Sequence, residues 1–294
     1  TKWQGLKSEF EKKFPGKNYS LISERETFTG MLRKECAGGE RVIVAAGGDG
    51  TVNFVLNRIM QMKESERKQV ILGAVGLGSS NDFHKPFNRD GCLKGNVPVR
   101  LDYKNAYRCN VARVDYEDEE YHWQRKYFII NFSFGVIAYA NFLFNSQEMV
   151  IDFFKSKWVM GAIWYAGLKT LFRAPNVPAE IKIGKKTFMS EVSNLSVLIN
   201  PHFSGNFCYD IDVSPRSDFL GAALCEGLGK FARLRTFFSL AKGRFSALPG
   251  ARVWKIPGIE IYSGLPAPLE LDGEVYIGRR IKIKLLKGGI NVCR

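Results

Sequence analysis

The strongest constraint on the fold is a buried strand that runs into a glycine-rich turn and then a helix. Val42–Ala46 is continuously apolar, as expected of a parallel strand covered on both faces, and Gly47-Gly48-Asp49-Gly50 ends it. Apolar residues then recur at helical spacing from Val52 to Met60, and Thr51 lies where a first helical turn favours an oxygen-bearing side chain. The sequence therefore predicts a strand over 41–46, a tight turn and a helix over 51–63.

The glycine turn is predicted to bind an anion. Without Cβ atoms at 47, 48 and 50 a ligand can approach the backbone, and the N–H groups of residues 47–51 then favour a phosphate. A turn that uses glycine only for backbone geometry is the alternative. Asp49 favours the binding site, because a carboxylate beside phosphates is unfavourable unless it holds Mg²⁺ or accepts a proton.

Length and composition indicate two domains and an anionic partner. With 294 residues, of which 45% are hydrophobic, the chain can bury one large core or two modest ones. Its net charge of +14 favours nucleic acid, an anionic bilayer or a phosphorylated substrate. The six cysteines form no Cys-x-x-Cys pair, and the three histidines are not spaced with Cys or Glu as metal ligands. Free thiols in a reducing compartment are expected.

Residues 1–100 are predicted to form an alternating α/β domain. Apolar periodicity indicates helices over 2–14, 26–36 and 51–63, and strands over 19–23, 41–46 and 69–75. Such alternation implies a parallel sheet with right-handed crossovers. Ligands bind beyond the carboxyl ends of such strands, where 23–25, 47–51 and 76–82 fall.

The sequence pattern changes after the loop at 91–98. Short β-rich segments bounded by Gly, Pro, Asn and Asp predict an antiparallel sheet structure with a few helices. They are 99–102, 106–116, 127–133, 179–183, 193–200, 256–263 and 280–286. The charge-free run 127–147 is long enough to span a bilayer, but its Asn, Ser and Gly residues favour a strand followed by a helix.

A second loop, Gly76-Leu-Gly-Ser-Ser-Asn-Asp-Phe83, suits a nucleotide site, with an Asx turn before a helix as the alternative. The first loop, GGDGTVN, resembles the signature of the diacylglycerol kinase catalytic-domain family, which includes bacterial lipid kinases and sphingosine and ceramide kinases; NAD kinases share its GGDGT core. The second loop is similar to that family's Pro-x-Gly-Thr-x-Asn-Asp-Phe, with Gly76 and Ser79 in place of proline and threonine.

The resemblance implies a fold and a set of nucleotide contacts. The expected fold is an N-terminal Rossmann-like α/β nucleotide domain over 1–100 and a C-terminal antiparallel β-sandwich-like lipid domain over 101–294, whose last residues pack back on the first. Ser23-Glu24-Arg25 resembles the family's Thr-Glu-Arg, although alone it would be read as a helix cap. The implied nucleotide contacts are Gly47, Gly48, Asp49, Gly50, Thr51, Asn53, Ser79, Asn81, Asp82 and Ser23.

Leu271-Asp272-Gly273-Glu274 is the third candidate motif. By itself it predicts a hairpin turn, although two carboxylates that flank a glycine can also provide a Mg²⁺ ligand and a general base. The family carries Asp-Gly-Glu at this place. The resemblance implies that Glu274 accepts the proton, and that Asp272 and Asp49 lie near the metal and the reacting hydroxyl.

The chain also departs from the family. The opening Asn-Pro-x-Ser-Gly strand and loop has no counterpart, which implies that this segment lies upstream or is lost. Phe54 replaces a glutamate, and Leu220-Gly221 replaces an Asp-Gly whose aspartate helps to hold a structural Mg²⁺; Asp218 is a poor substitute. Tyr139 stands where sphingosine kinases carry an acidic residue, which disfavours sphingosine as the substrate.

A basic segment follows within the second domain. Residues 227–255 hold seven basic residues and no acidic one, and Leu228, Phe231, Leu234, Phe238, Ala241 and Phe245 recur at helical spacing. This pattern predicts a helix that lies on an anionic membrane or, alternatively, one that covers the core and turns its charges to solvent. Residues 150–173 allow the same interpretation. Nucleic acid is not expected, because no recognised binding motif accompanies the charge.

Together these features predict a lipid kinase that transfers the γ-phosphate of ATP, with Mg²⁺, to a hydroxyl of a lipid such as diacylglycerol. We expect a cytoplasmic protein that associates peripherally with an anionic membrane, and we leave a homodimer open. The alternatives are an NAD kinase-like enzyme, and a membrane- or nucleotide-binding protein that retains the kinase scaffold without its activity.

Overall fold

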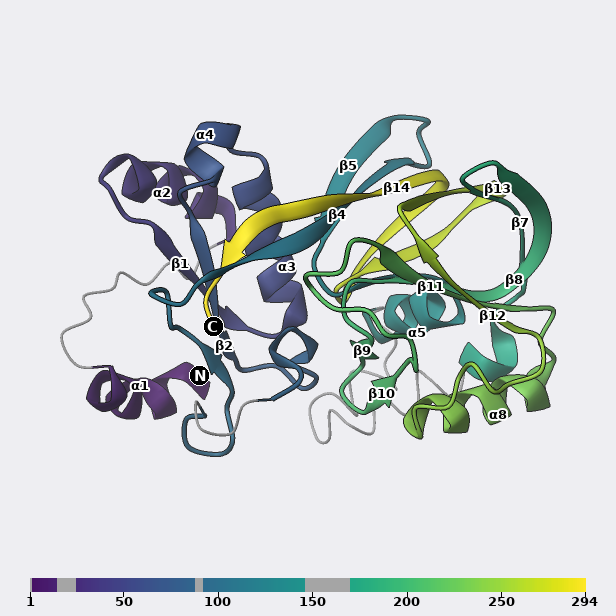
Figure 1. Ribbon diagram of the computed structural model, residues 1–294, viewed down its shortest axis with the longest axis horizontal. Helices are drawn as coiled ribbons and strands as arrows, with labels where there is room; N and C mark the ends of the chain where they lie inside the picture. Colours follow the sequence, from purple (N-terminus) through teal and green to yellow (C-terminus); the bar gives the residue numbers. More distant parts are fainter. Residues whose placement is uncertain (1, 15–24, 88–91, 146–169) are drawn as a thin grey trace. The chain divides into compact units, whose positions relative to one another are not determined.

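The structure is a computed structural model that describes residues 2–14, 25–87, 92–145 and 170–294 (Figure 1). The fold is a mixed α/β fold in which most regular elements are strands. The chain divides into two compact units, Thr1–Cys109 with Gly288–Arg294 and Asn110–Lys287. The division therefore falls nine residues beyond the end of the predicted segment 1–100, inside strand β4 (Tyr107–Glu117), and the chain returns to the first unit inside strand β14 (Glu274–Val292).

The sheet of the first unit is built around strand β2 (Ile71–Gly76). Strand β1 (Val42–Gly47) pairs with it in parallel, so that Val42 lies opposite Ile71 and Gly47 lies opposite Gly76. The other edge of β2 pairs with strand β3 (Val99–Arg100) and with the end of β14. Strand β3 thus lies within the predicted first domain, 1–100, and Arg100 lies opposite Ala74 of β2.

Helices α1 (Lys2–Lys13), α2 (Arg25–Ala37), α3 (Asp49–Met60) and α4 (Glu64–Arg67) complete the regular part of this unit. The apolar stripe of α3 is buried, as its periodicity predicts, and α3 packs on β1. The other face of β1 is less covered, because Val44 is 39% exposed, so the prediction of a strand buried on both faces is wrong for β1. Strand β2 is the one buried on both faces. The predicted strand at 19–23 lies outside the described residues.

Helix α3 begins two residues before the predicted start at 51. Gly48 is extended, with φ −88° and ψ −171°, and acts as the N-cap, so that Asp49 is already helical. The helix ends at Met60, where its buried stripe also ends. A separate short helix, α4, then occupies 64–67, which the sequence did not predict.

The second unit is a curved antiparallel arrangement of long strands. Strand β13 (Gly258–Leu271) pairs with β14, and β8 (Lys186–Leu198) pairs with β11 (Leu220–Glu226), which in turn pairs with β12 (Ala251–Ile256). Strands β7 (Val177–Ile183) and β6 (Asn131–Gly135) each lie between β13 and β8. They pair with different stretches of these two strands. The strands enclose one apolar core, to which Phe128, Phe132, Phe134, Leu195, Val197, Leu269, Leu271, Ile281 and Ile283 belong.

The predicted strand over 127–133 is two strands. Strand β5 (Trp123–Phe128) pairs with β4, whereas β6 pairs with β13 and β8, so the chain changes partners at Ile129 and Ile130. Helix α5 (Val136–Asn145) follows, as the strand-then-helix interpretation of 127–147 predicts. Two short strands, β9 (His202–Phe203) and β10 (Phe207–Cys208), form a separate pair.

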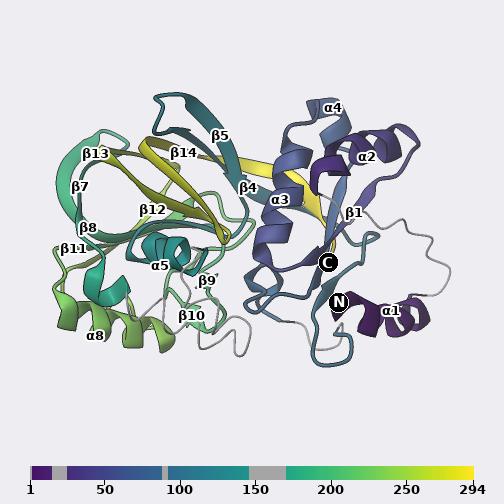
Figure 2. The same cartoon turned by 180° about the vertical axis from the view of Figure 1, so that it is seen from behind.

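Helix α8 (Lys230–Ala241) lies at the periphery of the second unit in Figure 1, and Figure 2 shows the same placement from behind. No helix in the described part of the chain is both long enough and apolar enough to cross a membrane.

Candidate active site

The two loops predicted to contact a nucleotide lie against each other in the first unit. A Cβ atom built on Gly78 would lie 2.4 Å from the Cα atom of Gly48, so the backbones meet with no room for a side chain. A Cβ atom on Gly47 would lie 2.2 Å from the Thr51 hydroxyl oxygen. These glycines are therefore required by contacts within the protein, in addition to any ligand that the turn accepts.

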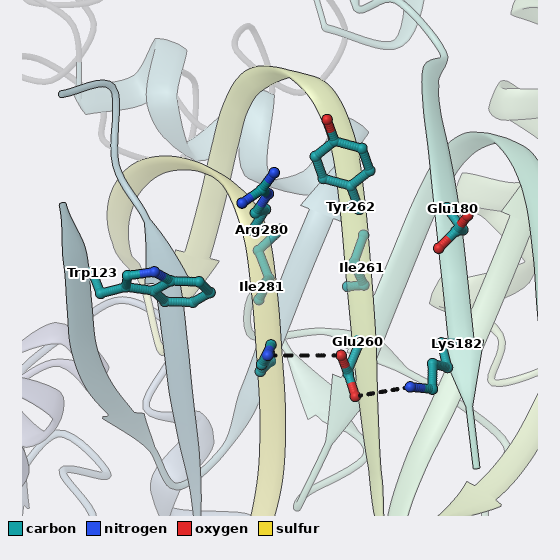
Figure 3. Close-up of a pocket in the computed structure, with 9 residues that line it drawn as sticks. Trp123, Glu180, Lys182, Glu260, Ile261, Tyr262, Arg280 and Ile281 are labelled. Carbon is teal, nitrogen blue, oxygen red and sulfur yellow. Dashed lines mark ion pairs between the residues drawn. The ribbon is translucent and has the colours of Figure 1, made fainter. Parts of the chain in front are cut away.

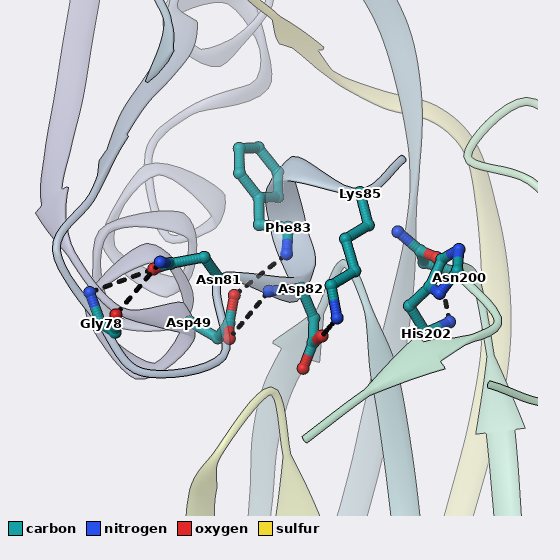
Figure 4. Close-up of polar contacts among 8 residues, drawn as sticks. All are labelled: Asp49, Gly78, Asn81, Asp82, Phe83, Lys85, Asn200 and His202. Atoms are coloured by element: carbon teal, nitrogen blue, oxygen red, sulfur yellow. Dashed lines mark hydrogen bonds and ion pairs between the residues drawn. The ribbon is translucent and has the colours of Figure 1, made fainter. Parts of the chain in front are cut away.

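Asp49 joins the two loops (Figure 4). One of its carboxylate oxygens accepts the Asp82 N–H at 3.1 Å, and the other accepts the Phe83 N–H at 3.0 Å. Asp82 and Phe83 begin the short 3₁₀ helix η1 (Asp82–His84). The carboxylate is thus stabilised by two backbone donors, which accounts for an acidic residue in this glycine turn.

Asn81 gives the second loop its shape. Its side chain accepts the Gly78 N–H at 3.0 Å and donates to the Gly78 carbonyl at 3.1 Å. Its own backbone is left-handed, with φ +53°, a conformation that asparagine tolerates well. Ser79, between the two, is exposed. The Asn81 side chain thus closes the loop back onto Gly78, three residues earlier, whereas the Asx turn left open by the sequence would bond two residues later.

Other predicted nucleotide contacts have different surroundings. Asn53 is 1% exposed, and it accepts a hydrogen bond from Asn57 one turn later through its backbone and side-chain oxygens. A direct contact between the Asn53 side chain and a ligand is not supported by this burial. Asp82 forms a buried ion pair with Lys85 at 2.8 Å, which the sequence analysis missed although the i, i+3 spacing could have indicated it. Ser23 lies outside the described residues.

His84 ends η1 in a buried position without a hydrogen-bond partner for either ring nitrogen among the described residues. Burial lowers the pKa of its imidazole from 6.5 to about 3, and the nearby Arg100 guanidinium adds to the lowering. Because the folded-state pKa lies below that of the unfolded chain, the neutral ring stabilises the fold at pH above 6.5, and this stability is lost as the pH falls toward 3.

Acidification from pH 7 to pH 5 is therefore expected to lower the free energy of unfolding by about 2 kcal/mol through His84 alone. Urea titrations at each pH should show that His84→Leu removes this part of the pH dependence. His122→Leu is the matched control, because His122 is exposed. An unchanged pH slope in His84→Leu would show that the fold does not lower the pKa of the His84 imidazole.

Asp272 and Gly273 form a two-residue hairpin turn between β13 and β14, with Leu271 opposite Glu274. Both turn residues have positive φ, +51° and +92°, as this class of hairpin requires. The Asp272 side chain is 3% exposed and accepts the backbone N–H groups of Ile129, Ile130 and Asn131 at 2.8–2.9 Å. Asp272 therefore fixes the hairpin to the break between β5 and β6.

Glu274 is the first residue of β14 and is half-buried. The preceding turn is held from within β13 as well, because the Gly273 N–H donates to the carboxylate of the buried Glu270 at 2.5 Å. Glu274 thus follows a turn that is anchored on both sides, by Asp272 and by Glu270.

The two carboxylates that were predicted to lie near a magnesium ion, Asp49 and Asp272, are bonded to backbone donors. Both oxygens of Asp49 and both oxygens of Asp272 already accept backbone N–H groups. Over the described ranges, no three His, Cys, Asp or Glu side chains are grouped as metal ligands. Gly48, the N-cap of α3, has no side chain that could cap the first N–H groups of the helix, which favours an anion at this end.

Comparison with known proteins identifies a family model that matches part of the chain. Residues 2–101 match the family model of the diacylglycerol kinase catalytic domain. These residues belong to that family. A Staphylococcus aureus (strain Mu3) protein named "Putative lipid kinase" is 22% identical over 255 residues, which cover 85% of this chain and 76% of that protein. The family model and this relative indicate a lipid kinase, which is a phosphotransferase.

Two solved structures from Bacillus anthracis str. Sterne share the fold. One, of a "putative diacylglycerol kinase", has a TM-score of 0.67 at 16% identity and covers 92% of this chain and 84% of its own. The other, of a diacylglycerol kinase, has a TM-score of 0.64 at 18% identity and covers 93% and 83%. At this identity the likeness concerns the fold alone.

Positions at which the chain departs from the family pattern have defined surroundings. Phe54 of α3 packs on Phe28 of α2, with ring centroids 5.4 Å apart, and the Arg25 and Arg58 guanidinium groups lie over its ring. In the second unit Leu220 is fully buried in the core, and Asp218 bonds Lys287 at 2.6 Å. Tyr139 packs partly buried against the core, and burial raises its pKa.

A pocket of about 320 Å³ on the second unit lies outside every predicted site. It is lined by side chains of β5, β7, β13 and β14 (Figure 3). Its charges are paired within the sheet, because Glu260 lies between Lys182 at 3.6 Å and Lys282 at 4.0 Å. The Lys282 amine also lies over the Trp123 ring. These are the cross-strand pairs that stabilise a solvated sheet face, and they do not form a catalytic group.

Proposed function

We propose that the protein is an ATP-dependent lipid kinase that transfers the γ-phosphate to a hydroxyl of diacylglycerol or a related glycerolipid. In this proposal the first unit is the Rossmann-like nucleotide domain, and the second is the sandwich-like lipid domain. The observation that carries the proposal is the contact between the two signature loops, which meet at Gly48 and Gly78 and are joined by Asp49.

Phosphoryl transfer depends on the positioning of the phosphates more than on covalent chemistry by the protein. Bound ATP supplies the phosphoryl group. In the proposal, backbone N–H groups at the start of α3 hold the phosphates, and the Asp49 link keeps the 78–83 loop at a fixed place beside them. Because the Asp49 carboxylate is bonded to two N–H groups, its repulsion of a neighbouring phosphate is reduced.

Glu274 is proposed to accept the proton of the lipid hydroxyl. As the hydroxyl oxygen forms its bond to the γ-phosphorus, the bond to the ADP oxygen breaks and the proton passes to the Glu274 carboxylate. Asp272 is not assigned a part in the transfer, since three backbone N–H groups occupy its carboxylate. Its part is to position the turn that precedes Glu274.

The test is the incorporation of label from γ-labelled magnesium ATP into a panel of lipids in anionic mixed micelles, with NAD as a further acceptor. We expect label in one glycerolipid. Glu274→Gln should lower its turnover by about 10²–10³-fold, because the amide cannot accept the proton. Glu260→Gln, on a solvated face of β13, is the matched control and should retain the wild-type rate.

Label in NAD alone would assign the protein to the NAD kinase-like alternative. Binding of ATP without label in any acceptor would favour the alternative of a non-catalytic scaffold. A wild-type rate in Glu274→Gln would remove Glu274 from the transfer step and leave the lipid kinase proposal intact.

A further inference from the structure

Helix α8 is held to the second unit by a buried arginine. Arg233 is 6% exposed, and its guanidinium donates to the carbonyls of Leu228, Leu171 and Ala174 and to the Asn176 side chain, at 2.5–3.3 Å. Leu240, seven residues later and therefore on the same side of the helix, is also buried. These two residues determine which side of α8 faces the protein.

The opposite side of α8 exposes aromatic rings. Phe231 is 86% exposed and Phe238 is 53% exposed, and their separation of seven positions places both on one stripe, two turns apart. The predicted apolar stripe thus faces away from the core at these two positions. Phe245, predicted to extend it, lies beyond the end of the helix and is buried against Tyr209.

Cations accompany the exposed rings. Arg235 and Lys242 are also seven residues apart and exposed, and Lys230 and Arg244 lie near the two ends of the helix. In the described part of the chain none of these four forms an ion pair, whereas Arg252 pairs with Glu226 and Lys255 pairs with Asp212. No acidic residue lies between 227 and 255 that could neutralise them locally.

We propose that this side of α8, defined by Phe231, Phe238, Arg235 and Lys242, docks on an anionic lipid bilayer. The helix would lie parallel to the surface, with the two rings among the acyl chains and the cations at the lipid phosphates. A bilayer is favoured over an acidic protein because a single helix offers a narrow stripe of exposed rings flanked by cations. The inference extends the proposed function and does not depend on it.

The experiment is co-sedimentation of the full chain with phosphatidylcholine vesicles that contain 30% or no phosphatidylserine, without nucleotide. We expect binding to the anionic vesicles only, which weakens as salt rises from 50 to 500 mM. Phe231→Ser with Phe238→Ser, and separately Arg235→Gln with Lys242→Gln, should each lower the partition coefficient by about tenfold or more. All four side chains are exposed, so both double variants should fold.

The matched controls replace exposed apolar and basic side chains elsewhere on the second unit. Leu265→Ser deletes a side chain that is 79% exposed, and Lys185→Gln with Lys186→Gln removes two exposed charges from the turn between β7 and β8. Both controls should bind as the wild type does. The proposal would be overturned if either α8 variant bound as the wild type does, or if the controls lost binding equally. Equal binding of the wild type to vesicles without phosphatidylserine would also overturn it.

A second measurement separates docking from catalysis. Phosphorylation of a short-chain, water-soluble diacylglycerol should be unchanged in the α8 variants, because this acceptor needs no bilayer. If vesicle binding fails while this activity persists, only the docking proposal is wrong. If vesicle binding depends on α8 and no acceptor is phosphorylated, the docking proposal stands and the kinase proposal is wrong.

Discussion

Asp49→Asn is expected to lower the rate of phosphate transfer on the order of 10³-fold. The carboxylate of Asp49 accepts the Asp82 and Phe83 N–H groups with separate oxygens, at 3.1 and 3.0 Å. An asparagine side chain offers one acceptor oxygen and turns an NH₂ group toward the second donor, so two donors face each other. The loop at 78–83 would then leave its place beside Gly48, and the phosphates would lose their fixed surroundings. Turnover with γ-labelled ATP measures the effect.

Asp212→Asn is the control for Asp49→Asn. The Asp212 side chain is 99% exposed and forms a single long ion pair, so its neutralisation should leave turnover unchanged. The affinity for ATP then separates two roles of Asp49. If Asp49→Asn binds ATP more weakly, the carboxylate acts by positioning the loops. Unchanged ATP affinity with lost turnover would indicate that the carboxylate acts in the transfer step itself, and a wild-type rate would contradict both.

The strand, turn and helix around Gly47–Gly50 could be predicted because their determinants are local. An apolar run marks β1, the glycines mark its end, and the spacing of apolar residues marks α3. The partners of Asp49 could not be predicted in this way. They lie 33 and 34 residues later, and the bonds depend on how β1 and β2 align their carboxyl ends. Local composition therefore did not indicate the backbone donors that the fold provides to Asp49.

The side of helix α8 that faces the core could not be predicted from local sequence either. Its periodicity identified a helix, and the absence of acidic residues identified its charge, but neither indicates which side faces the core. That choice depends on carbonyls at Leu171 and Ala174, about 60 residues earlier, which accept the Arg233 guanidinium. An arginine in a basic segment would ordinarily be assigned to solvent. Its burial is what exposes Phe231 and Phe238.

Asp272→Ala is expected to lower the free energy of unfolding by roughly 3–5 kcal/mol. The substitution leaves the buried N–H groups of Ile129, Ile130 and Asn131 without their acceptor, and it places alanine at φ +51°, a left-handed conformation that alanine disfavours. Urea titration measures the loss. Amide hydrogen exchange should locate it, with faster exchange at 129–131 before the rest of the second unit responds.

Asp272→Asn is the matched variant, because asparagine tolerates the same φ and keeps one acceptor oxygen. Oδ1 of Asp272 accepts two of the three N–H groups and Oδ2 accepts the third, so one amide oxygen could retain two bonds while the NH₂ group opposes the Ile129 N–H. Its destabilisation should therefore be about half that of Asp272→Ala. Equal stability of both variants and the wild type would show that water replaces the carboxylate at this site. A loss of turnover in Asp272→Asn that exceeds its loss of stability would instead return Asp272 to the reaction itself.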